Sequence, residues 1–288
     1  MHKIGLITNY RQEKAPEFAA RLAEWLTSHD FESYSLARQE DAPPDLYTAG
    51  EIPLMDNTDM VIAIGGDGTL LSAARITAPY GIPILGVNMG NLGFLTEVEA
   101  ENLYSCLEQV FRGDYAEDHR MMLQAEVRRN GKTIRVMSGL NDVVIHKGAL
   151  SRLLEINFWV EKDFAGSYKG DGIIIASPTG STAYSLSSGG PVVHPSLEVM
   201  VQTWICPHTM TARPTIIPSD KHCIIELEDV SSEVLLTVDG QASQPLQEKD
   251  QILIKKAPYK AIFIRLTPLK FFSLLKTKLG GDTALRYE

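Results

Sequence analysis

The stretch VIAIGGDGTLLSAA, residues 61–74, passes from an apolar run through a glycine-rich turn into a second apolar run. The first run predicts a buried parallel strand over Met60–Ile64. The second predicts a helix, with Thr69 as its cap. A strand, a glycine turn and a helix in this order are typical of α/β domains that bind phosphate groups at helix N-termini.

The same alternation of strand and helix extends on both sides of this stretch. Short apolar runs predict strands at Ile4–Thr8 and Ile84–Val87, and apolar residues at helical spacing predict helices after Pro16 and around Ala100–Phe111. This order predicts a doubly wound α/β domain in the N-terminal part of the chain.

From about Met121 the hydrophobic period changes to two, which is typical of strands. Asn130-Gly131 lies between two such runs and predicts a hairpin. We therefore expect a β-rich, sandwich-like domain over residues 120–255. The apolar tail Ile262–Leu275 is expected to return to the first domain. That domain would then comprise residues 1–119 and about 256–288, with linkers around 113–120 and 255–260.

Composition narrows the class of protein. The chain has 288 residues, 44% hydrophobic and 22% charged, with a formal net charge of -9. The negative charge argues against nucleic acid as a partner. Cys106, Cys206 and Cys223 lie far apart without metal-ligand spacing, which predicts buried free thiols. The sequence begins without a signal-like leader and has no apolar run of spanning length, so we expect a cytoplasmic protein without membrane contact.

Asp67 stands in the middle of the glycine turn, where it would repel a phosphate. The turn lacks the lysine of the nucleoside-triphosphate loop, and its spacing differs from the dinucleotide fingerprint GxGxxG. A carboxylate there suits acceptance of a hydrogen bond or a proton from a sugar hydroxyl that attacks phosphorus. The alternative is a tight turn in which Asp67 caps the helix.

A second polar block, GDGIIIASPTGSTAYSLSSGGP, occupies residues 170–191. Its dense hydroxyl groups and glycines would make a poor core, but they suit a backbone that wraps a polar ligand. The chain lacks the G-x-S-x-G elbow, so a serine hydrolase is not indicated.

Three separated blocks resemble the NAD kinase family, whose members phosphorylate the adenosine ribose 2′-hydroxyl of NAD to make NADP. These blocks are GGDGT at 65–69, Asn141-Asp142 in LNDVVIH, and DGIIIASPTGSTAYSLSSGGP at 171–191. GVNMGNLGFLTEV at 86–98 and TVDGQ at 237–241 support the likeness. The resemblance implies a phosphofructokinase-like α/β domain followed by the β-rich domain. It also implies ATP as donor, with polyphosphate as the alternative donor, a divalent cation such as Mg2+ held mainly by the donor phosphates, and a homodimer or homotetramer.

By this resemblance, Asp67 accepts the proton of the 2′-hydroxyl, and Gly68 lies against the dinucleotide. Asn141 and Asp142 would hold the adenine and ribose. Asp171 would contact the nicotinamide portion, either within the same subunit or from a neighbouring one. The phosphate loop would consist of Gly65, Gly66 and Thr69. The remaining substrate-binding candidates are Phe94, Arg152, Lys169, Thr179, Thr182, Ala183, Tyr184, Ser187 and Gln241.

Several of these assignments have alternatives. Arg152 and Lys169 are chosen because a diphosphate needs cations nearby, although Lys169 is equally compatible with a solvated surface. Phe94 is nearly as compatible with the core, and Gln241 follows an Asp-Gly pair that predicts a hairpin turn. For the whole chain, a lipid or sugar kinase that shares GGDGT, or a non-catalytic NAD(P)-binding sensor, stays open.

Overall fold

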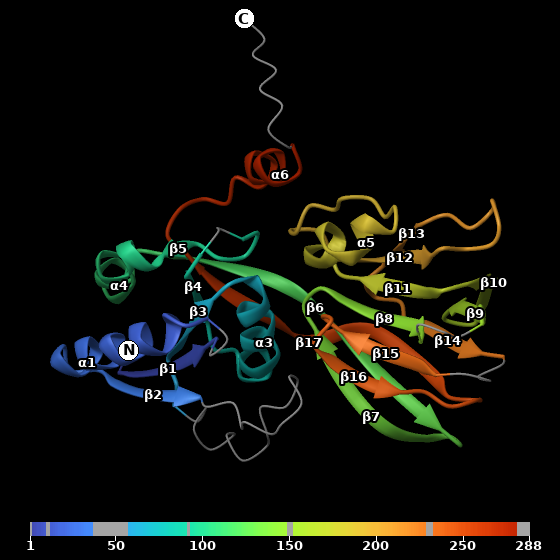
Figure 1. Ribbon diagram of the computed structural model, residues 1–288, viewed down its shortest axis with the longest axis horizontal. Coiled ribbons are helices and arrows are strands. Elements are labelled where there is room, and N and C mark those ends of the chain that lie inside the picture. Colours follow the sequence, from blue (N-terminus) through green and yellow to red (C-terminus); the bar gives the residue numbers. More distant parts are fainter. Residues whose placement is uncertain are drawn as a thin grey trace, which may run out of the picture.

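One large sheet runs through both halves of the chain (Figure 1). In this computed structural model the described residues are 2–9, 12–36, 57–90, 93–148, 152–228 and 233–280. Within them an 11-stranded sheet has the strand order β10-β9-β14-β17-β4-β3-β1-β2, and β5, β6 and β7 pair alongside this path. A six-stranded sheet has the order β13-β12-β11-β8-β15-β16.

The N-terminal elements alternate as the sequence predicts. They are β1 (Lys3–Thr8), α1 (Ala15–Ser28), β2 (Glu32–Leu36), β3 (Met60–Gly65), α3 (Asp67–Thr77), η2 (Ala78–Tyr80), β4 (Ile84–Asn88), β5 (Val98–Glu99), η3 (Ala100–Asn102) and α4 (Leu103–Phe111).

Strands β2, β1, β3 and β4 are parallel, and helices cover both of their faces. Along β3, Met60 and Ile62 share one apolar cluster with α1 and α4, whereas Val61 and Ala63 share another with α3. Because successive strand side chains point to opposite faces, α1 and α4 lie opposite α3. The predicted doubly wound arrangement is confirmed.

The expected helix cap at Thr69 is wrong. Helix α3 begins at Asp67, and Gly66 is its N-cap without a side-chain hydrogen bond. The extended backbone of Gly66 lets its carbonyl accept from the N–H groups of Thr69 and Leu70. Thr69 is therefore already inside the first turn, buried beside Gly65, where an added Cβ would lie 2.2 Å from the Thr69 hydroxyl.

The C-terminal part is a sandwich of two sheets. Its elements are β6 (Ala116–Arg129), β7 (Lys132–Gly139), β8 (Asp142–Lys147), β9 (Leu154–Val160), β10 (Asp163–Gly170), β11 (Gly172–Ala176), η4 (Thr179–Thr182), α5 (Tyr184–Ser187), β12 (Val199–Ile205), β13 (Thr215–Pro218), β14 (Cys223–Leu227), β15 (Val234–Val238), β16 (Ala242–Pro245), β17 (Gln251–Arg265) and α6 (Phe271–Leu279).

The sandwich core takes side chains from both sheets. Val143 and Ile145 of β8 share it with Ile156 of β9 and Ile252 of β17. The predicted hairpin is present between β6 and β7, with positive φ at both Asn130 and Gly131. The predicted β-rich, sandwich-like part is therefore confirmed.

The predicted linkers are largely strand. β6 and β17 pair from Gln251–Arg128 to Arg265–Ala116, and Figure 1 shows both passing from one half of the molecule to the other. A register shift between Lys256 and Lys260 accommodates the polar stretch that suggested a linker. Phe263 of β17 pairs with Ile84 of β4, so the tail does rejoin the N-terminal sheet. The division into domains stays a prediction.

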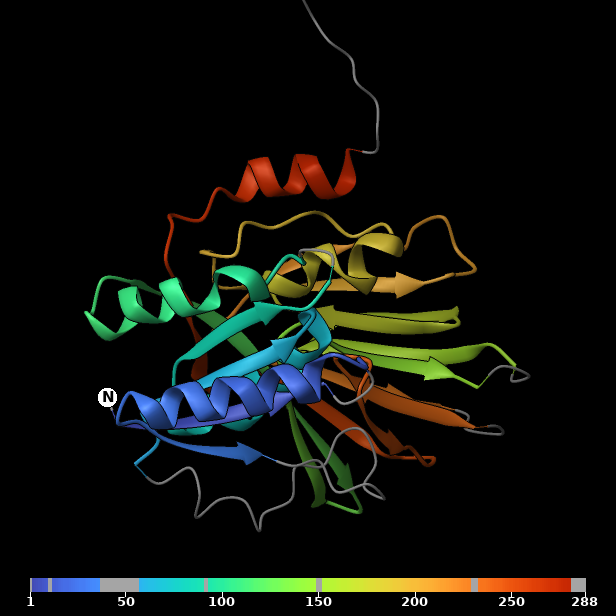
Figure 2. The ribbon, with the colours of Figure 1, turned by 60° about the vertical axis from the view of Figure 1, so that its left-hand side comes forward.

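Helix α6 lies beyond the end of β17, on the same side of the molecule as α5 (Figure 2). Its first residue, Phe271, is buried and its ring meets His194 edge-on at 4.8 Å. No helix in the described ranges is both long and apolar enough to cross a membrane. All three cysteines are free, but only Cys223 is buried; Cys206 is exposed, in a turn with positive φ.

Candidate active site

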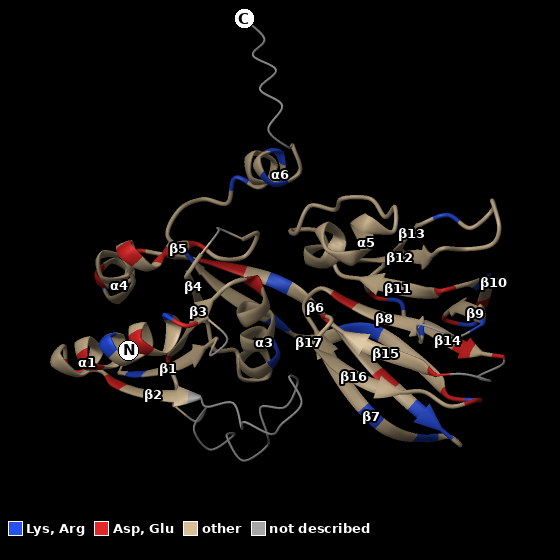
Figure 3. Cartoon of the chain, viewed as in Figure 1, with Lys and Arg blue, Asp and Glu red and all other residues tan. Residues whose placement is uncertain are grey.

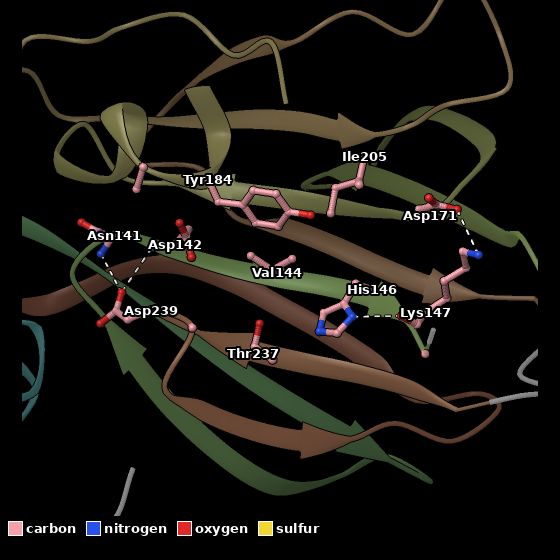
Figure 4. Close-up of a pocket in the computed structure, with 13 residues that line it drawn as sticks. Asn141, Asp142, Val144, His146, Lys147, Asp171, Tyr184, Ile205, Thr237 and Asp239 are labelled. Atoms are coloured by element: carbon pink, nitrogen blue, oxygen red, sulfur yellow. Dashed lines mark hydrogen bonds and ion pairs between the residues drawn. The ribbon is translucent and has the colours of Figure 1, made fainter. Parts of the chain in front are cut away.

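A cleft of about 660 Å³ lies on the outer face of the six-stranded sheet. Its floor is β8, because Asp142, Val144 and His146 point away from the sandwich core that Val143 and Ile145 enter. Tyr184 lies across the cleft from β8 (Figure 4), and Ala183 also lines it. The Ser177 N–H donates to the Asn141 carbonyl, which ties the turn after β11 to the start of β8. The lining residues are Asn141, Asp142, Val144, His146, Lys147, Gly148, Asp171, Ala183, Tyr184, Ile205, Thr237, Asp239 and Gly240.

Five predicted substrate-binding residues converge on this cleft, namely Asn141, Asp142, Asp171, Ala183 and Tyr184. Antiparallel pairing of β8 with β11 opposes Asp142 to Ala176, which brings the 171–191 block beside the Asn-Asp pair. Gly180 allows close approach there, since an added Cβ would lie 2.0 Å from the Asn141 carbonyl oxygen. The cleft thus joins two sequence blocks that were predicted separately.

Asp142 is only 4% exposed, and none of the described residues hydrogen-bonds to its carboxylate. Burial, together with the nearby charge of Asp239, raises its pKa to about 7. Buried carboxylates normally have hydrogen-bond partners, so this one is suited to a ligand that brings donors such as ribose hydroxyls.

Asp239 anchors the end of the cleft through its own hydrogen bonds. It accepts backbone N–H bonds from Leu140, Asn141 and Asp142, and its side chain is fully buried. Burial raises its pKa, which the Arg75 charge and the backbone donors oppose. The hairpin turn that carries it has positive φ at Asp239 and Gly240, as the Asp-Gly pair predicts.

Replacing Asp142 by Asn should stabilise the ligand-free protein at about pH 8 and have little effect at about pH 3.5, below the ordinary pKa of 3.8. Because the folded-state pKa of about 7 lies above the ordinary 3.8, the ionised carboxylate destabilises the fold above pH 7, by up to roughly 4 kcal/mol at about 1.4 kcal/mol per pKa unit. The penalty disappears as the pH falls from 7 toward 3.8. Thermal unfolding measures this, with the exposed Asp163→Asn as control. An equal change at both pH values would contradict the assignment.

Asp67 lies at the start of α3, and the turn after β4 holds its carboxylate. Oδ2 accepts from the Phe94 N–H at 2.7 Å, and Oδ1 accepts from those of Leu95 and Thr96 at 3.1 and 3.3 Å. Asp67 is thus held by a loop and does not cap its own helix. Oδ2 has a single bond of this kind and retains acceptor capacity for a further donor.

This turn depends on a glycine and a buried ion-pair network. A Cβ on Gly93 would lie 1.9 Å from Asp67 Oδ1, so glycine is required for this carboxylate position. Arg265 donates to the Leu95 carbonyl and to Asp118. Burial works to raise the pKa of Asp118, but Arg120 and Arg265 outweigh it and hold that pKa below its usual range.

Gln241 connects α3 with the hairpin that lines the cleft. Its amide nitrogen donates to the Gly68 carbonyl at 2.8 Å, and its amide oxygen accepts from Ser72 and Arg75 at 2.8 and 2.7 Å. The turn carrying Asp67 is therefore hydrogen-bonded to the cleft wall. Gln241 directly follows the hairpin turn that the Asp-Gly pair predicts, and its role as a substrate-binding residue stays a prediction.

The other candidates lie outside the cleft wall. Thr179 accepts a hydrogen bond from the buried Arg120, and Thr182 donates to the Thr179 carbonyl. Phe94 is half-buried and contributes its backbone N–H to Asp67. Gly65, Gly66, Gly68 and Thr69 surround the start of α3, and Ser187 is exposed on α5.

The two expected cations are not part of the cleft lining. Arg152 is exposed, and Lys169 on β10 forms an ion pair with Glu155 at 3.2 Å. The lysine that lines the cleft is Lys147, whose ammonium lies 3.4 Å from Asp171 Oδ1. Figure 4 shows this pair at the opposite end from Asn141 and Asp142.

Charge is mixed over the molecule: acidic and basic residues are interspersed along the described strands (Figure 3). Within the described ranges, no group of three or more His, Cys, Asp or Glu side chains is arranged to hold a metal ion.

Two family models match separate stretches of the chain, and curated relatives match nearly all of it. The ATP-NAD kinase N-terminal domain model matches residues 4–115, and the ATP-NAD kinase C-terminal domain model matches residues 140–266. The NAD kinase of Thermoanaerobacter sp. (strain X514) is 41% identical over 280 residues, which cover 97% of this chain and 99% of that protein. The NAD kinase of Natranaerobius thermophilus is 42% identical over 287 residues, 98% of this chain and 99% of that one.

Two solved structures share the fold. A yeast NADH kinase complexed with NADH superposes with a TM-score of 0.87 at 24% identity, covering 100% of this chain and 90% of that one. An NAD kinase from Archaeoglobus fulgidus in complex with ATP superposes with a TM-score of 0.71 at 22% identity, covering 97% and 98%. Because two family models match most of the chain and relatives of about 40% identity cover nearly all of it, the chain belongs to the NAD kinase family.

Proposed function

We propose that the chain transfers the γ-phosphoryl group of ATP to the 2′-hydroxyl of the adenosine ribose of NAD, giving NADP and ADP. Membership of the NAD kinase family makes the chain an enzyme that phosphorylates NAD with ATP. The matched relatives are named NAD kinases, so the lipid kinase, the sugar kinase and the non-catalytic sensor have no support.

One observation carries the placement of NAD: Asn141, Asp142, Asp171, Ala183 and Tyr184, from two sequence blocks, line a single cleft. Its volume, about 660 Å³, is within the range of small-molecule and cofactor sites. We place the adenosine at the Asn141–Asp142 end, because an amide pairs with an adenine edge and a buried carboxylate can accept from ribose hydroxyls. The Lys147–Asp171 pair then faces the diphosphate and nicotinamide portion.

Asp67 would act at the ribose. The 2′-oxygen attacks the γ-phosphorus, a new O–P bond forms, and the bond between that phosphorus and the β,γ-bridging oxygen breaks to release ADP. The hydroxyl proton passes to Asp67 Oδ2, the carboxylate oxygen with one backbone donor. Because such transition states are loose, positioning of the hydroxyl contributes more than the strength of the base.

The glycine loop would bring backbone groups close to the donor phosphates. Gly66 has an extended backbone, and an added Cβ there would meet no atom within 4 Å, so the space beside it is open. In our proposal Mg2+ is held mainly by the donor phosphates and neutralises their developing charge.

We also propose that the protein is cytoplasmic and acts as a homodimer or homotetramer, as the family resemblance implies. Light scattering during size-exclusion chromatography measures the number of subunits directly. A monomer that still makes NADP would contradict the proposal that a neighbouring subunit completes the site.

The proposed reaction is tested by incubating the purified chain with ATP, Mg2+ and NAD, and following NADP with an NADP-specific dehydrogenase. We expect NADP to accumulate in proportion to ADP, and none to form without ATP. Thermal stabilisation by NAD with no NADP formed would contradict an enzymatic role and favour a binding protein.

A further inference from the structure

Arg75 of α3 spans two parts of the proposed site. One guanidinium nitrogen, Nη1, donates to Asp239 Oδ2 at 3.0 Å, and the other, Nη2, donates to Gln241 Oε1 at 2.7 Å. The Arg75 side chain is 12% exposed and that of Asp239 is fully buried, so water competes little for this contact. A planar guanidinium with two fixed donors holds both acceptors in a defined direction.

The hydrogen bonds continue on both sides of Arg75. Toward the cleft, Asp239 accepts from the backbone of Asn141 and Asp142, which we place against adenosine. Toward the glycine loop, Gln241 donates to the Gly68 carbonyl, next to Asp67. A continuous series of hydrogen bonds therefore joins Asn141 and Asp142, which we place at the adenosine, to Gly68, the chain neighbour of Asp67.

We propose that Arg75 is a positioning residue that sets the distance between Asp67 and the adenosine ribose, an inference that rests on the proposed function. Asp67 is the first residue of α3, which packs on the N-terminal sheet, whereas Asn141 and Asp142 lie at the start of β8 in the sandwich. The distance between Asp67 and these two residues therefore depends on contacts between the two parts. A displacement of about 1 Å between reacting groups can cost about 100-fold in rate. Arg75 is not part of the cleft lining, and it acts through Asp239 and Gln241.

The test compares Arg75→Met, which removes both donors, with Arg75→Lys, which keeps the charge but lacks the planar pair of donors. We expect Arg75→Met to lower kcat about 10- to 100-fold, while the Kd for NAD measured without ATP changes by about threefold or less. Arg75→Lys should recover part of kcat, with the same Kd. The exposed Arg21→Met, which removes an ion pair with Glu17 on α1, is the matched control and should leave both constants unchanged.

Two results would overturn the proposal. One is a wild-type kcat in Arg75→Met. The other is a loss in which NAD affinity and the folded fraction fall together with kcat, which indicates a purely structural role. If Arg75→Met does not fold, the same comparison of kcat with Kd is made on Arg75→Lys. Absence of NADP formation by the wild-type chain would instead refute the proposed function itself.

Discussion

Asp67→Asn is expected to lower kcat by about 10²- to 10⁴-fold, the usual contribution of a positioned general base. The change keeps the size of the side chain, but an amide cannot take the proton of the attacking hydroxyl. It also offers one acceptor oxygen where Asp67 satisfies three backbone N–H groups with two. Because we place NAD in the cleft, whose lining does not include Asp67, its Kd should change by about threefold or less.

Steady-state kinetics with saturating ATP and a separate NAD titration measure the two quantities. Asp114→Asn, an exposed carboxylate after α4, is the control and should leave both constants at their wild-type values. A turnover of Asp67→Asn near that of the wild type would show that another group receives the proton.

Gly93→Ala is expected to reduce kcat by at least about 100-fold, because it displaces the Asp67 carboxylate. The new Cβ would lie 1.9 Å from Asp67 Oδ1 and 2.5 Å from Oδ2, so the carboxylate must move away from its three backbone donors. Because the clash involves the end of a side chain and Gly93 has no positive φ, we expect the fold to tolerate alanine better than the activity does.

Gly90→Ala is the matched control, since a Cβ there would meet no atom within 4 Å. The measurement compares kcat and the melting temperature of both variants with those of the wild type. If Gly93→Ala kept full kcat with a normal melting temperature, the observed position of the Asp67 carboxylate would not be the one needed for turnover.

Much of the fold follows from local pattern. The parallel strands and helices around residues 61–74 and the hairpin at Asn130-Gly131 were predicted from periodicity and turn residues, and the structure confirms them. The crossing strands were missed, because the polar residues near Lys255–Lys260 suggest a linker when considered alone. Only pairing with β6 across both halves makes this stretch a strand.

The candidate site was predictable where its residues lie in blocks. Asn141, Asp142 and the 171–191 block meet as expected, since β8 and β11 are neighbours. Lys147 was not predicted, because its place in the cleft depends on β8 ending beside Asp171. Arg152 and Lys169 were predicted instead, because they flank the two ligand-binding blocks in the sequence. Because alternate residues of a strand point to the same face, Asp142 could have indicated that Val144 and His146 also line the cleft.

The contacts of Arg75 had no local signal at all. Arg75 and Asp239 are 164 positions apart, and Arg75 on its own resembles any cation near the end of a helix. They meet because α3 packs against the sandwich, and this packing cannot be predicted from the spacing of residues in the sequence. Asp239 itself could have been noticed, because TVDGQ was already one of the matching segments.

The position of the transferred phosphate tests the central claim most directly. Product formed from ATP, Mg2+ and NAD by the wild-type chain is purified, and its phosphorus NMR spectrum is compared with those of the 2′- and 3′-phosphate isomers. We predict a single product with the phosphate on the adenosine 2′-oxygen, formed in equal amount to ADP. Phosphate at another hydroxyl, or ADP released without phosphorylated NAD, would contradict the account.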